Sequence, residues 1–472
     1  MELYKQASAY FGHSGGPYSL YVLGQQLIVV TQPEHKAQIF KDNEVYSFDT
    51  FIDLLYSRVG NVSDAALAIL WRKPCDGFVS LHPNPKQKVL VHTGQELLHK
   101  QLLSPGPSRD LLVKAAVNLE LNMRWDAIAS TDMTSQAADR TVKVIGLHSW
   151  CRDVAIGSQT DTFFGPYLSE LEPDYRLIYD QWDINSWMST YSYPSFMAKP
   201  ATVPREKLVK VIMGYLDGPP ERKSENVAYV SELEQEMRHA GLDSETCARI
   251  LMMILWGLNS NVQMTTFWVM VHILQDAALV ADVRKEIVPI MEAVSRTKSN
   301  YSEMMRDGLF RSCPVLNSVF NEILRFYNTG SSMRETTREA CIAGKTIPKG
   351  TKIILPQRQL LLAPEAFGED AQTVNPYRFV QNKDIERHEY YRPFGQGITH
   401  CSGKTIGRFE VLAFVAWALW RYKLKVVALG QKAIDGTEGK TVPRIDLKKP
   451  SLGISKQIEG DDLVLEVRQW ST

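Results

Sequence analysis

Hydrophobic and polar residues alternate near the start of the chain, and hydrophobic residues recur at helical spacing over most of the rest. The alternating runs 18–24 and 26–32 predict two strands, followed by a short helix that begins at Pro33. Short apolar runs with Gly and Pro turns over 344–355 predict further strands. The pattern therefore predicts a mainly α-helical protein that carries small β-sheets.

The longest helical pattern begins at Asp243 or Ser244, which are good N-cap residues, and ends near Gln275. A helix of this length measures roughly 50 Å and would cross a whole domain. Its centre, WGLNSNVQMTTFW at 256–268, holds polar residues in a run that is otherwise apolar. Two interpretations are open: a polar stripe that faces water, or a buried helix that bends at a polar binding site. A membrane span is disfavoured, because the polar groups would lie at the centre of the bilayer.

A second helix is predicted over 314–328, where a proline opens a run with apolar residues at helical spacing. Glu322 and Arg325 lie three residues apart on one face of it, and alone such a pair is typical of a surface ion pair. Proline- and serine-rich stretches around Pro105 and Pro107 and over 192–204 predict surface loops.

The charge balance excludes one class of partner. The 472 residues include 53 basic and 53 acidic side chains, so no net field attracts the chain to nucleic acid. The six cysteines are scattered without zinc-type spacing or disulfide density, which indicates a reducing compartment. The first 60 residues hold no apolar run of spanning length and no signal-peptide pattern, so we expect a soluble chain.

One cysteine lies in a glycine-rich stretch, FGQGITHCSG at 394–403. Glycines on both sides of Cys401 leave little side-chain bulk, so a flat ligand could approach the backbone there. The following residues, 402–424, predict a helix, and a helix N-terminus favours a thiolate. A thiolate surrounded by backbone N–H donors is suited to be an axial metal ligand.

The pattern Phe394-x-x-Gly397-x-x-x-Cys401-x-Gly403 resembles the haem-binding signature of the cytochrome P450 family, the standard example of thiolate-ligated haem. The resemblance implies haem b as cofactor, with Cys401 as the iron ligand and Phe394, Gly397 and Gly403 forming the loop around it. It also implies the family's fold, which is mainly α with small β-sheets and a long central helix over the haem. It covers essentially all of the chain, so we expect a single catalytic domain over 1–472.

Three further segments resemble the family in the correct order. Glu322-x-x-Arg325 is similar to its E-x-x-R helix, and PYRF at 376–379 is similar to its P-x-R-F segment. GKTIPKGT at 344–351 is similar to the strand turn between them. The resemblance implies that Glu322, Arg325 and Arg378 form the charged triad that locks the haem-side core.

The resemblance also implies contacts with the haem propionates. His99 stands at the family's cationic position in the C-helix, although Gln95 replaces the usual tryptophan. Arg334 fits a second propionate partner. Thr399 stands where many members carry an arginine, and whether His400 replaces that arginine is open.

At the centre of the long helix, many members carry an acid and then a threonine that relay protons. Ser260 and Asn261 stand at these places, and we expect them to be the catalytic residues. With Trp256 and the TTFW ending, the helix resembles that of fungal members and of the branch with prostacyclin synthase and the cholesterol hydroxylases. This branch contains redox-neutral isomerases and monooxygenases, so the reaction is not decided.

We expect a monooxygenase that takes electrons from NADPH through a separate reductase, the cytochrome P450 reductase, which could dock at Lys100, Lys404 and Arg408. The alternative is a redox-neutral isomerase or dehydratase that acts on a peroxide substrate, like prostacyclin synthase. A haem–thiolate sensor or carrier is a third class, and the complete set of family motifs argues against it.

The resemblance places the substrate pocket at segments rich in aromatic and aliphatic residues: 60–90, 183–197, Trp182, Trp187, 256–261 and 331–333. We expect an apolar small molecule such as a terpenoid, steroid, alkaloid or polyketide, in secondary metabolism. Eukaryotic relatives are anchored to the endoplasmic reticulum membrane on its cytosolic face. We expect the same location and a monomer, with the N-terminal anchor absent from this chain or removed.

Overall fold

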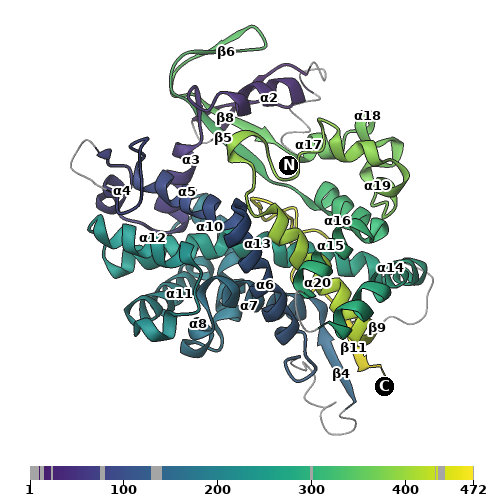
Figure 1. Ribbon diagram of the computed structural model, residues 1–472. Helices are drawn as coiled ribbons and strands as arrows, with labels where there is room; N and C mark the ends of the chain where they lie inside the picture. The colour runs from purple at the N-terminus through teal and green to yellow at the C-terminus, as the bar shows by residue number, and fades with distance from the viewer. Residues whose placement is uncertain are drawn as a thin grey trace. The chain divides into compact units, whose positions relative to one another are not determined.

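A computed structural model gives the fold of the chain (Figure 1). It describes residues 10, 15–22, 25–74, 80–128, 141–297, 301–430, 432–433 and 442–470. The predicted class is confirmed, since helices predominate and the strands form small sheets.

The chain divides into two compact units. We call them the sheet unit and the helical unit. The sheet unit comprises Met1–Leu54, Asn317–Cys401 and Ile445–Gln457, and the helical unit comprises Leu55–Leu316, Ser402–Arg444 and Ile458–Thr472. The single catalytic domain over 1–472 stays a prediction.

In the described part of the sheet unit, the main sheet has the strand order β1-β2-β8-β5-β3, and β6 pairs with β7 in a separate hairpin. The β2–β8 pair is parallel and the other pairs are antiparallel. The two predicted N-terminal strands are confirmed as β1 and β2. The strands are β1 (Tyr18–Val22), β2 (Gln25–Val29), β3 (Tyr46–Ser47), β5 (Ser331–Thr336), β6 (Ala340–Ile342), β7 (Lys345–Ile347) and β8 (Lys352–Pro356).

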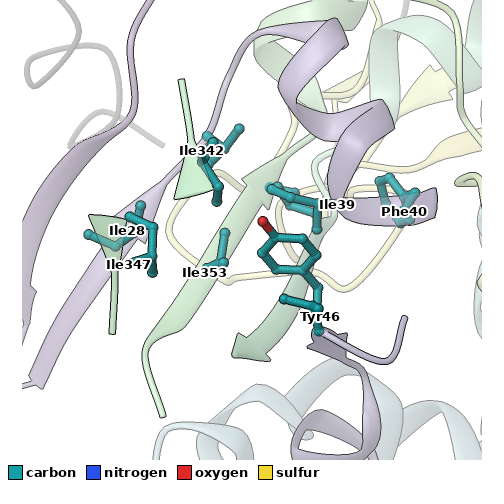
Figure 2. Packing of buried hydrophobic residues seen from close by; sticks show 10 residues of the cluster. Ile28, Ile39, Phe40, Tyr46, Ile342, Ile347 and Ile353 are labelled. Carbon is teal, nitrogen blue, oxygen red and sulfur yellow. The ribbon is translucent and has the colours of Figure 1, made fainter. Parts of the chain in front are cut away.

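Helix α2 (Pro33–Lys41) packs on this sheet, and it begins at the predicted proline. Figure 2 shows Ile39 of α2 beside Tyr46 and Ile353, in a cluster whose members are at most 7% exposed. Burying each such side chain stabilises the fold by about 1.5–3 kcal/mol. The cluster also holds Phe40, whose ring and backbone reach the functional site described below.

The remaining helices of the sheet unit are short, apart from α16, most of which belongs to it. They are α3 (Asp49–Leu54), α16 (Pro314–Tyr327), α17 (Arg358–Leu361), α18 (Pro364–Phe367), η5 (Glu369–Gln372), α19 (Arg378–Gln381), η6 (Lys383–Arg387) and η7 (Gly397–Thr399).

Helix α13 (Ser244–Leu274) is the centre of the helical unit, and the predicted long helix is confirmed at both ends. Asp243 is its N-cap, and the Asp243 carboxylate accepts a hydrogen bond of 2.8 Å from the Thr246 N–H. Most of the helix is buried, including the polar Asn259 and Gln263, so only some of its central polar residues can face water. Only a narrow stripe at its centre is open, where Gly257 and Asn261 are exposed.

Around α13, the helical unit contains long helices and a sheet of order β10-β9-β11-β4 among its described residues. Its helices are η1 (Leu55–Val59), α4 (Asp64–Leu70), α5 (Leu90–Leu103), α6 (Pro105–Asn122), α7 (Leu147–Phe164), α8 (Tyr167–Leu171), α9 (Tyr175–Asn185), α10 (Trp187–Thr190), α11 (Lys199–Asp217), η4 (Pro220–Lys223), α12 (Ala228–His239), α14 (Ala277–Arg296), α15 (Tyr301–Arg311) and α20 (Lys404–Arg421). Its strands are β4 (Val142–Gly146), β9 (Tyr422–Leu429), β10 (Lys432–Ala433) and β11 (Leu463–Gln469).

Two loop predictions are wrong. The segment with Pro105 and Pro107 is the first turn of α6, where the backbone N–H groups have no helical acceptor and proline therefore loses no hydrogen bond. The predicted loop over 192–204 ends earlier, because α11 begins at Lys199 and contains Pro204. Burial of one face of α11, with Leu208 and Ile212 fully covered, outweighs the hydrogen bond that Pro204 removes.

Among the described residues, no single helix is both long enough and apolar enough to cross a membrane. Helices α13 and α14, which are bent by 114° relative to each other, pass the criterion of length and composition only as a pair.

Candidate functional site

The sheet unit contains a buried cluster of charges that joins α16 to the segment before α19. Arg325 binds both oxygens of Glu322, with Nε–Oε2 and Nη2–Oε1 distances of 2.7 Å. Arg378 donates from Nε to the same carboxylate at 3.2–3.3 Å and forms an ion pair of 2.7 Å with Asp370. Two arginines thus face two carboxylates, so the charge of the cluster is balanced.

Backbone groups complete this cluster. Arg325 donates to the carbonyl oxygens of Leu361, Ala371 and Thr373 at 2.7–2.9 Å, while the Glu322 carboxylate accepts from the Asn375 N–H at 2.8 Å. A guanidinium has five N–H donors, and here all five have acceptors. The cluster therefore fixes an irregular stretch of chain to a helix.

The structure brings the three predicted triad residues together and adds a fourth, Asp370, which sequence reasoning missed. Hydrogen bonding from Arg378 lowers the pKa of the Asp370 carboxyl below its usual value. Asp370 lies eight residues before Arg378 in a segment without a periodic pattern, so no sequence signal distinguished it from other surface acids.

The cysteine loop follows a tight backbone path. The Cys401 N–H donates to the Phe394 carbonyl oxygen at 2.9 Å, which closes the loop between them. Gly397 has a φ of 65°, and a Cβ at this position would collide with the carbonyl oxygen of Phe40. Cys401 itself is exposed, so its thiol is accessible from one side of the loop. The loop is thus shaped to present a sulfur atom.

Arg334 of β5 lies beside this loop. Its Nη2 donates to the Thr399 Oγ1 at 2.6 Å, and its guanidinium carbon lies 4.8 Å and 4.6 Å from the ring centroids of Phe40 and Phe48. Arg334 is 1% exposed, and burial lowers the pKa of its guanidinium to about 10. It therefore stays charged at neutral pH. Within the described part of the chain, Arg334 has no ion pair, and its Nε has no hydrogen-bond acceptor.

These residues fit a haem. A buried cation with an unused N–H donor needs an anion, and a haem carries two propionates. The exposed Cys401 offers a sulfur ligand, and the glycine path keeps side chains away from it. Cys401 would ligate the iron, and Arg334 with Thr399 would hold a propionate.

The other predicted propionate contacts are placed differently. His99 is half-buried on α5 and belongs to the helical unit. The His400 Nδ1 lies 2.9 Å from the Gly397 carbonyl oxygen, to which it must donate, so this ring nitrogen is used within the loop.

Gly403 is the N-cap residue of α20, which begins three residues after Cys401. The predicted helix over 402–424 ends earlier, because strand β9 starts at Tyr422.

The two predicted catalytic residues lie at the open stripe of α13. Asn261 is exposed, and its carbonyl oxygen accepts a hydrogen bond of 2.6 Å from the Thr265 hydroxyl. Ser260 is partly buried, and its hydroxyl lies 3.0 and 3.1 Å from the two carboxylate oxygens of Asp183 on α9. Sequence reasoning missed this partner, because 77 residues separate Asp183 from Ser260.

Of the residues expected to line a substrate pocket, Trp182 is fully buried and packs with a centroid distance of 5.7 Å on Trp256. Its ring is therefore covered by protein and is not exposed to a ligand. Trp187 packs on Tyr193. Part of the 60–90 segment, residues 75–79, lies outside the described residues.

The three residues proposed for reductase docking belong to the helical unit and have different surroundings. Lys100 forms an ion pair of 3.0 Å with Glu232, and the Arg408 guanidinium lies 4.7 Å from the Phe310 ring centroid. Lys404 is exposed at the first position of α20.

Glu410 on α20 was also missed. It is 4% exposed, and neither carboxylate oxygen has a hydrogen-bond partner among the described residues. Burial raises the pKa of Glu410 to about 8. A single acid within the apolar run 409–419 was the signal that could have identified it.

Three features together fit the class of haem–thiolate proteins: the exposed Cys401 in a glycine-rich loop, the buried Arg334 and the Glu322–Arg325–Arg378 cluster. The sequence model of the cytochrome P450 family matches residues 140–445. The chain belongs to this family, as the sequence resemblance indicated.

Named relatives support this assignment. The chain is 23% identical to the cytochrome P450 monooxygenase nodJ of Hypoxylon pulicicidum, over 87% of this chain and 76% of that protein. It is 25% identical to the cytochrome P450 monooxygenase poxD of Penicillium oxalicum, over 51% and 50%, and 27% identical to an ent-kaurenoic acid oxidase of Oryza sativa subsp. japonica, over 49% and 46%. The matched segment thus spans about half the length of two of these relatives.

Among solved structures, the fold is similar to that of the cyanobacterial CYP120A1 bound to retinoic acid. The TM-score is 0.66 at 15% identity, over 98% of this chain and 93% of the other. The predicted fold is thereby confirmed. The narrower resemblance to the branch with prostacyclin synthase stays a prediction.

Proposed function

We propose that this protein is a haem–thiolate monooxygenase that hydroxylates, epoxidises or oxidatively rearranges an apolar small molecule. The observation that carries the proposal is the buried Arg334 of β5, a cation that donates a hydrogen bond to Thr399 of the Cys401 loop and has no anionic partner among the described residues. The monooxygenase names of the fungal relatives support the reaction class.

A haem held by Cys401 would supply the redox chemistry of a monooxygenation, in which two electrons, two protons and O₂ yield an oxygenated substrate and water. The chain positions the group. The Phe394–Cys401 backbone hydrogen bond and the close contact of Gly397 with Phe40 hold the sulfur. The Glu322–Arg325–Arg378 cluster joins the segment 361–375 to α16 through hydrogen bonds. Ser260 and Asn261 are the residues through which we expect protons to pass.

The substrate proposed is a terpenoid, steroid, alkaloid or polyketide of secondary metabolism. Aromatic side chains at Trp256 and Trp187, which are partly exposed, suit an apolar ligand. One relative in rice is named for the oxidation of ent-kaurenoic acid. Binding of candidate compounds can be ranked by the change that each causes in the haem absorption spectrum.

The partners proposed are cytochrome P450 reductase, which would deliver electrons from NADPH, and the cytosolic face of the endoplasmic reticulum membrane in the native protein. The enzyme would act as a monomer. Lys404 and Lys100 are both exposed, and we choose Lys404 as the docking residue to test because Lys100 already forms an ion pair with Glu232. Lys404→Glu should slow reduction by the reductase and leave reduction by dithionite unchanged. Fractionation of the native protein from its own cells tests the location.

The carbon monoxide difference spectrum tests the proposal. Protein reduced by dithionite and by NADPH with reductase should both show the red-shifted Soret band of a thiolate haem. Cys401→Ser should abolish this band, whereas Cys341→Ser should retain it, since Cys341 is an exposed cysteine of the same unit on the β6–β7 hairpin. A normal band in the Cys401 variant would overturn the assignment of the ligand.

A second candidate function is a redox-neutral isomerase or dehydratase that acts on a peroxide. The observation that favours it is Asn261, an exposed amide at the place of the family's relay alcohol. Substrate turnover without reductase or NADPH would support this function over the first.

A further inference from the structure

Asp183, in the last turn of α9, is held against α13 by two different donors. The Trp256 Nε1 lies 2.5 Å from the Asp183 Oδ1, and the Ser260 Oγ lies 3.0 Å from Oδ1 and 3.1 Å from Oδ2. Asp183 is 4% exposed, so this carboxyl group is buried between the two helices. All three residues belong to the helical unit.

Ser260 connects this buried group to an open surface. Its neighbours on α13, Gly257 and Asn261, are exposed, and a Cβ added to Gly257 would meet no atom within 4 Å. Ser260 itself is partly exposed. Its hydroxyl is therefore in hydrogen-bond contact with Asp183 on one side and lies next to open space on the other.

A second carboxyl group, that of Asp180, also lies between α9 and α13, but its partner on α13 is a buried residue. Asp180, one turn before Asp183, accepts a hydrogen bond of 3.1 Å from Gln263, one turn after Ser260. Asp180 is 6% exposed, and Gln263 is completely buried. Asp180 thus joins α9 to α13 in the same way as Asp183, but without an alcohol at the open stripe.

We propose that Asp183 is the proton donor of this enzyme and that Ser260 transfers its proton to the open stripe of α13. Ser260 stands at the position of α13 where many family members carry an acid. In this chain the acid would be Asp183, which belongs to α9. The inference rests on the proposed monooxygenase function, because only that reaction consumes protons.

The hydrogen-bond pattern supports a transfer in one direction. When Asp183 is a carboxylate, the Ser260 hydroxyl donates to it. When Asp183 is the acid, it donates to the Ser260 oxygen, and the Ser260 O–H rotates toward the open side. Transfer of that proton to a reactant there, with uptake of the Asp183 proton by Ser260, leaves Asp183 as a carboxylate that solvent reprotonates. The indole N–H of Trp256 keeps the carboxyl group in place throughout.

Three substitutions test the proposal: Asp183→Asn, Ser260→Ala and the matched control Asp180→Asn. Asp183→Asn keeps the shape and the hydrogen bonds but has no acidic proton. In the NADPH-driven reaction, Asp183→Asn and Ser260→Ala should lower product formation on the order of a hundredfold, with electrons diverted to hydrogen peroxide. Asp180→Asn should resemble wild type. Iodosylbenzene, which donates a single oxygen atom and needs no proton, should restore product formation in both variants.

A structural role for Asp183 would give a different result. It would reduce the NADPH-driven and iodosylbenzene-driven reactions equally, and Asp180→Asn would do the same. That outcome, or unchanged coupling in Asp183→Asn, would overturn the proposal.

A readout that does not depend on turnover separates this inference from the proposed function. The infrared stretch of carbon monoxide on the reduced protein should shift in Asp183→Asn and Ser260→Ala and remain in place in Asp180→Asn. If wild type shows no NADPH-driven turnover but the shift is present, the monooxygenase function fails and the Asp183–Ser260 connection stands. If the stretch is the same in all four proteins, the connection fails. If no carbon monoxide band forms, both fail.

Discussion

Arg325 and Arg334 are two buried arginines of the sheet unit with opposite surroundings. Arg325 is completely buried, binds Glu322 through two hydrogen bonds and reaches three backbone carbonyls. Arg334 is 1% exposed, yet its partners are the Thr399 hydroxyl, a neighbouring carbonyl and two aromatic rings. One charge is neutralised by the protein, and the other is not.

The difference distinguishes structural charges from functional ones. Burying a charge is costly unless a counter-charge and hydrogen bonds compensate for the loss of water. The charges of Glu322 and Arg325 compensate each other within the chain, so this pair can stabilise the fold without a ligand. Burial lowers the pKa of Arg334 to about 10, and an anionic ligand would compensate for the cost of burying this charge.

The largest effect is expected when the compensated cluster is broken. Glu322→Gln leaves two buried guanidinium groups without their shared counter-charge and should lower the free energy of unfolding by about 3–5 kcal/mol. Urea unfolding and the yield of protein with the thiolate Soret band would measure it. Asp370→Asn is the matched control, because Asp370 is half exposed and such pairs contribute about 1 kcal/mol or less. Equal losses in the two variants would contradict this account of the cluster.

The second prediction concerns the uncompensated arginine. Arg334→Met should raise the free energy of unfolding of the haem-free protein by about 1–3 kcal/mol, because a buried charge without a counter-ion is removed. The same substitution should accelerate haem loss to an acceptor protein on the order of tenfold to a hundredfold.

Arg334→Met should therefore stabilise the haem-free protein and weaken haem binding. Arg325→Met is the control, since it should destabilise the haem-free and the haem-bound protein alike. A haem-free Arg334→Met protein that is less stable than wild type would show that Arg334 is structural.

The third prediction concerns Glu410, a buried acid of the helical unit whose carboxylate oxygens have no hydrogen-bond partner among the described residues. Its pKa is raised to about 8, whereas an unfolded chain has a glutamate pKa of about 4.3. The folded protein therefore binds one more proton than the unfolded chain in this window, and stability should fall as the pH rises from 5 to 8.5. Glu410→Gln cannot ionise, so it should remove this fall and stabilise the protein at pH 8.5 on the order of 3 kcal/mol.

Thermal unfolding at pH 5 and pH 8.5 would measure the Glu410 effect. The variant and wild type should have similar midpoints at pH 5 and different ones at pH 8.5. Parallel pH profiles would mean that Glu410 has a partner in the folded protein.

The sequence predicted those parts of the site whose signals are local. The helix that carries Glu322 and Arg325, the long helix from Asp243 and the glycine loop around Cys401 each follow from residues within one or a few turns of one another. The prolines at 105 and 107 misled the prediction because the same residue type both ends helices and begins them.

The sequence by itself thus determined the fold class, the family and the position of the sulfur, because periodicity, capping and motif spacing are properties of short segments. Only the tertiary structure decided which charges are compensated. Asp370 turns toward Arg378, Phe40 reaches both Arg334 and Gly397, and Asp183 on α9 reaches Ser260 on α13. Such contacts join segments that are distant in sequence, and the electrostatic cost of a buried group depends on what the fold places beside it.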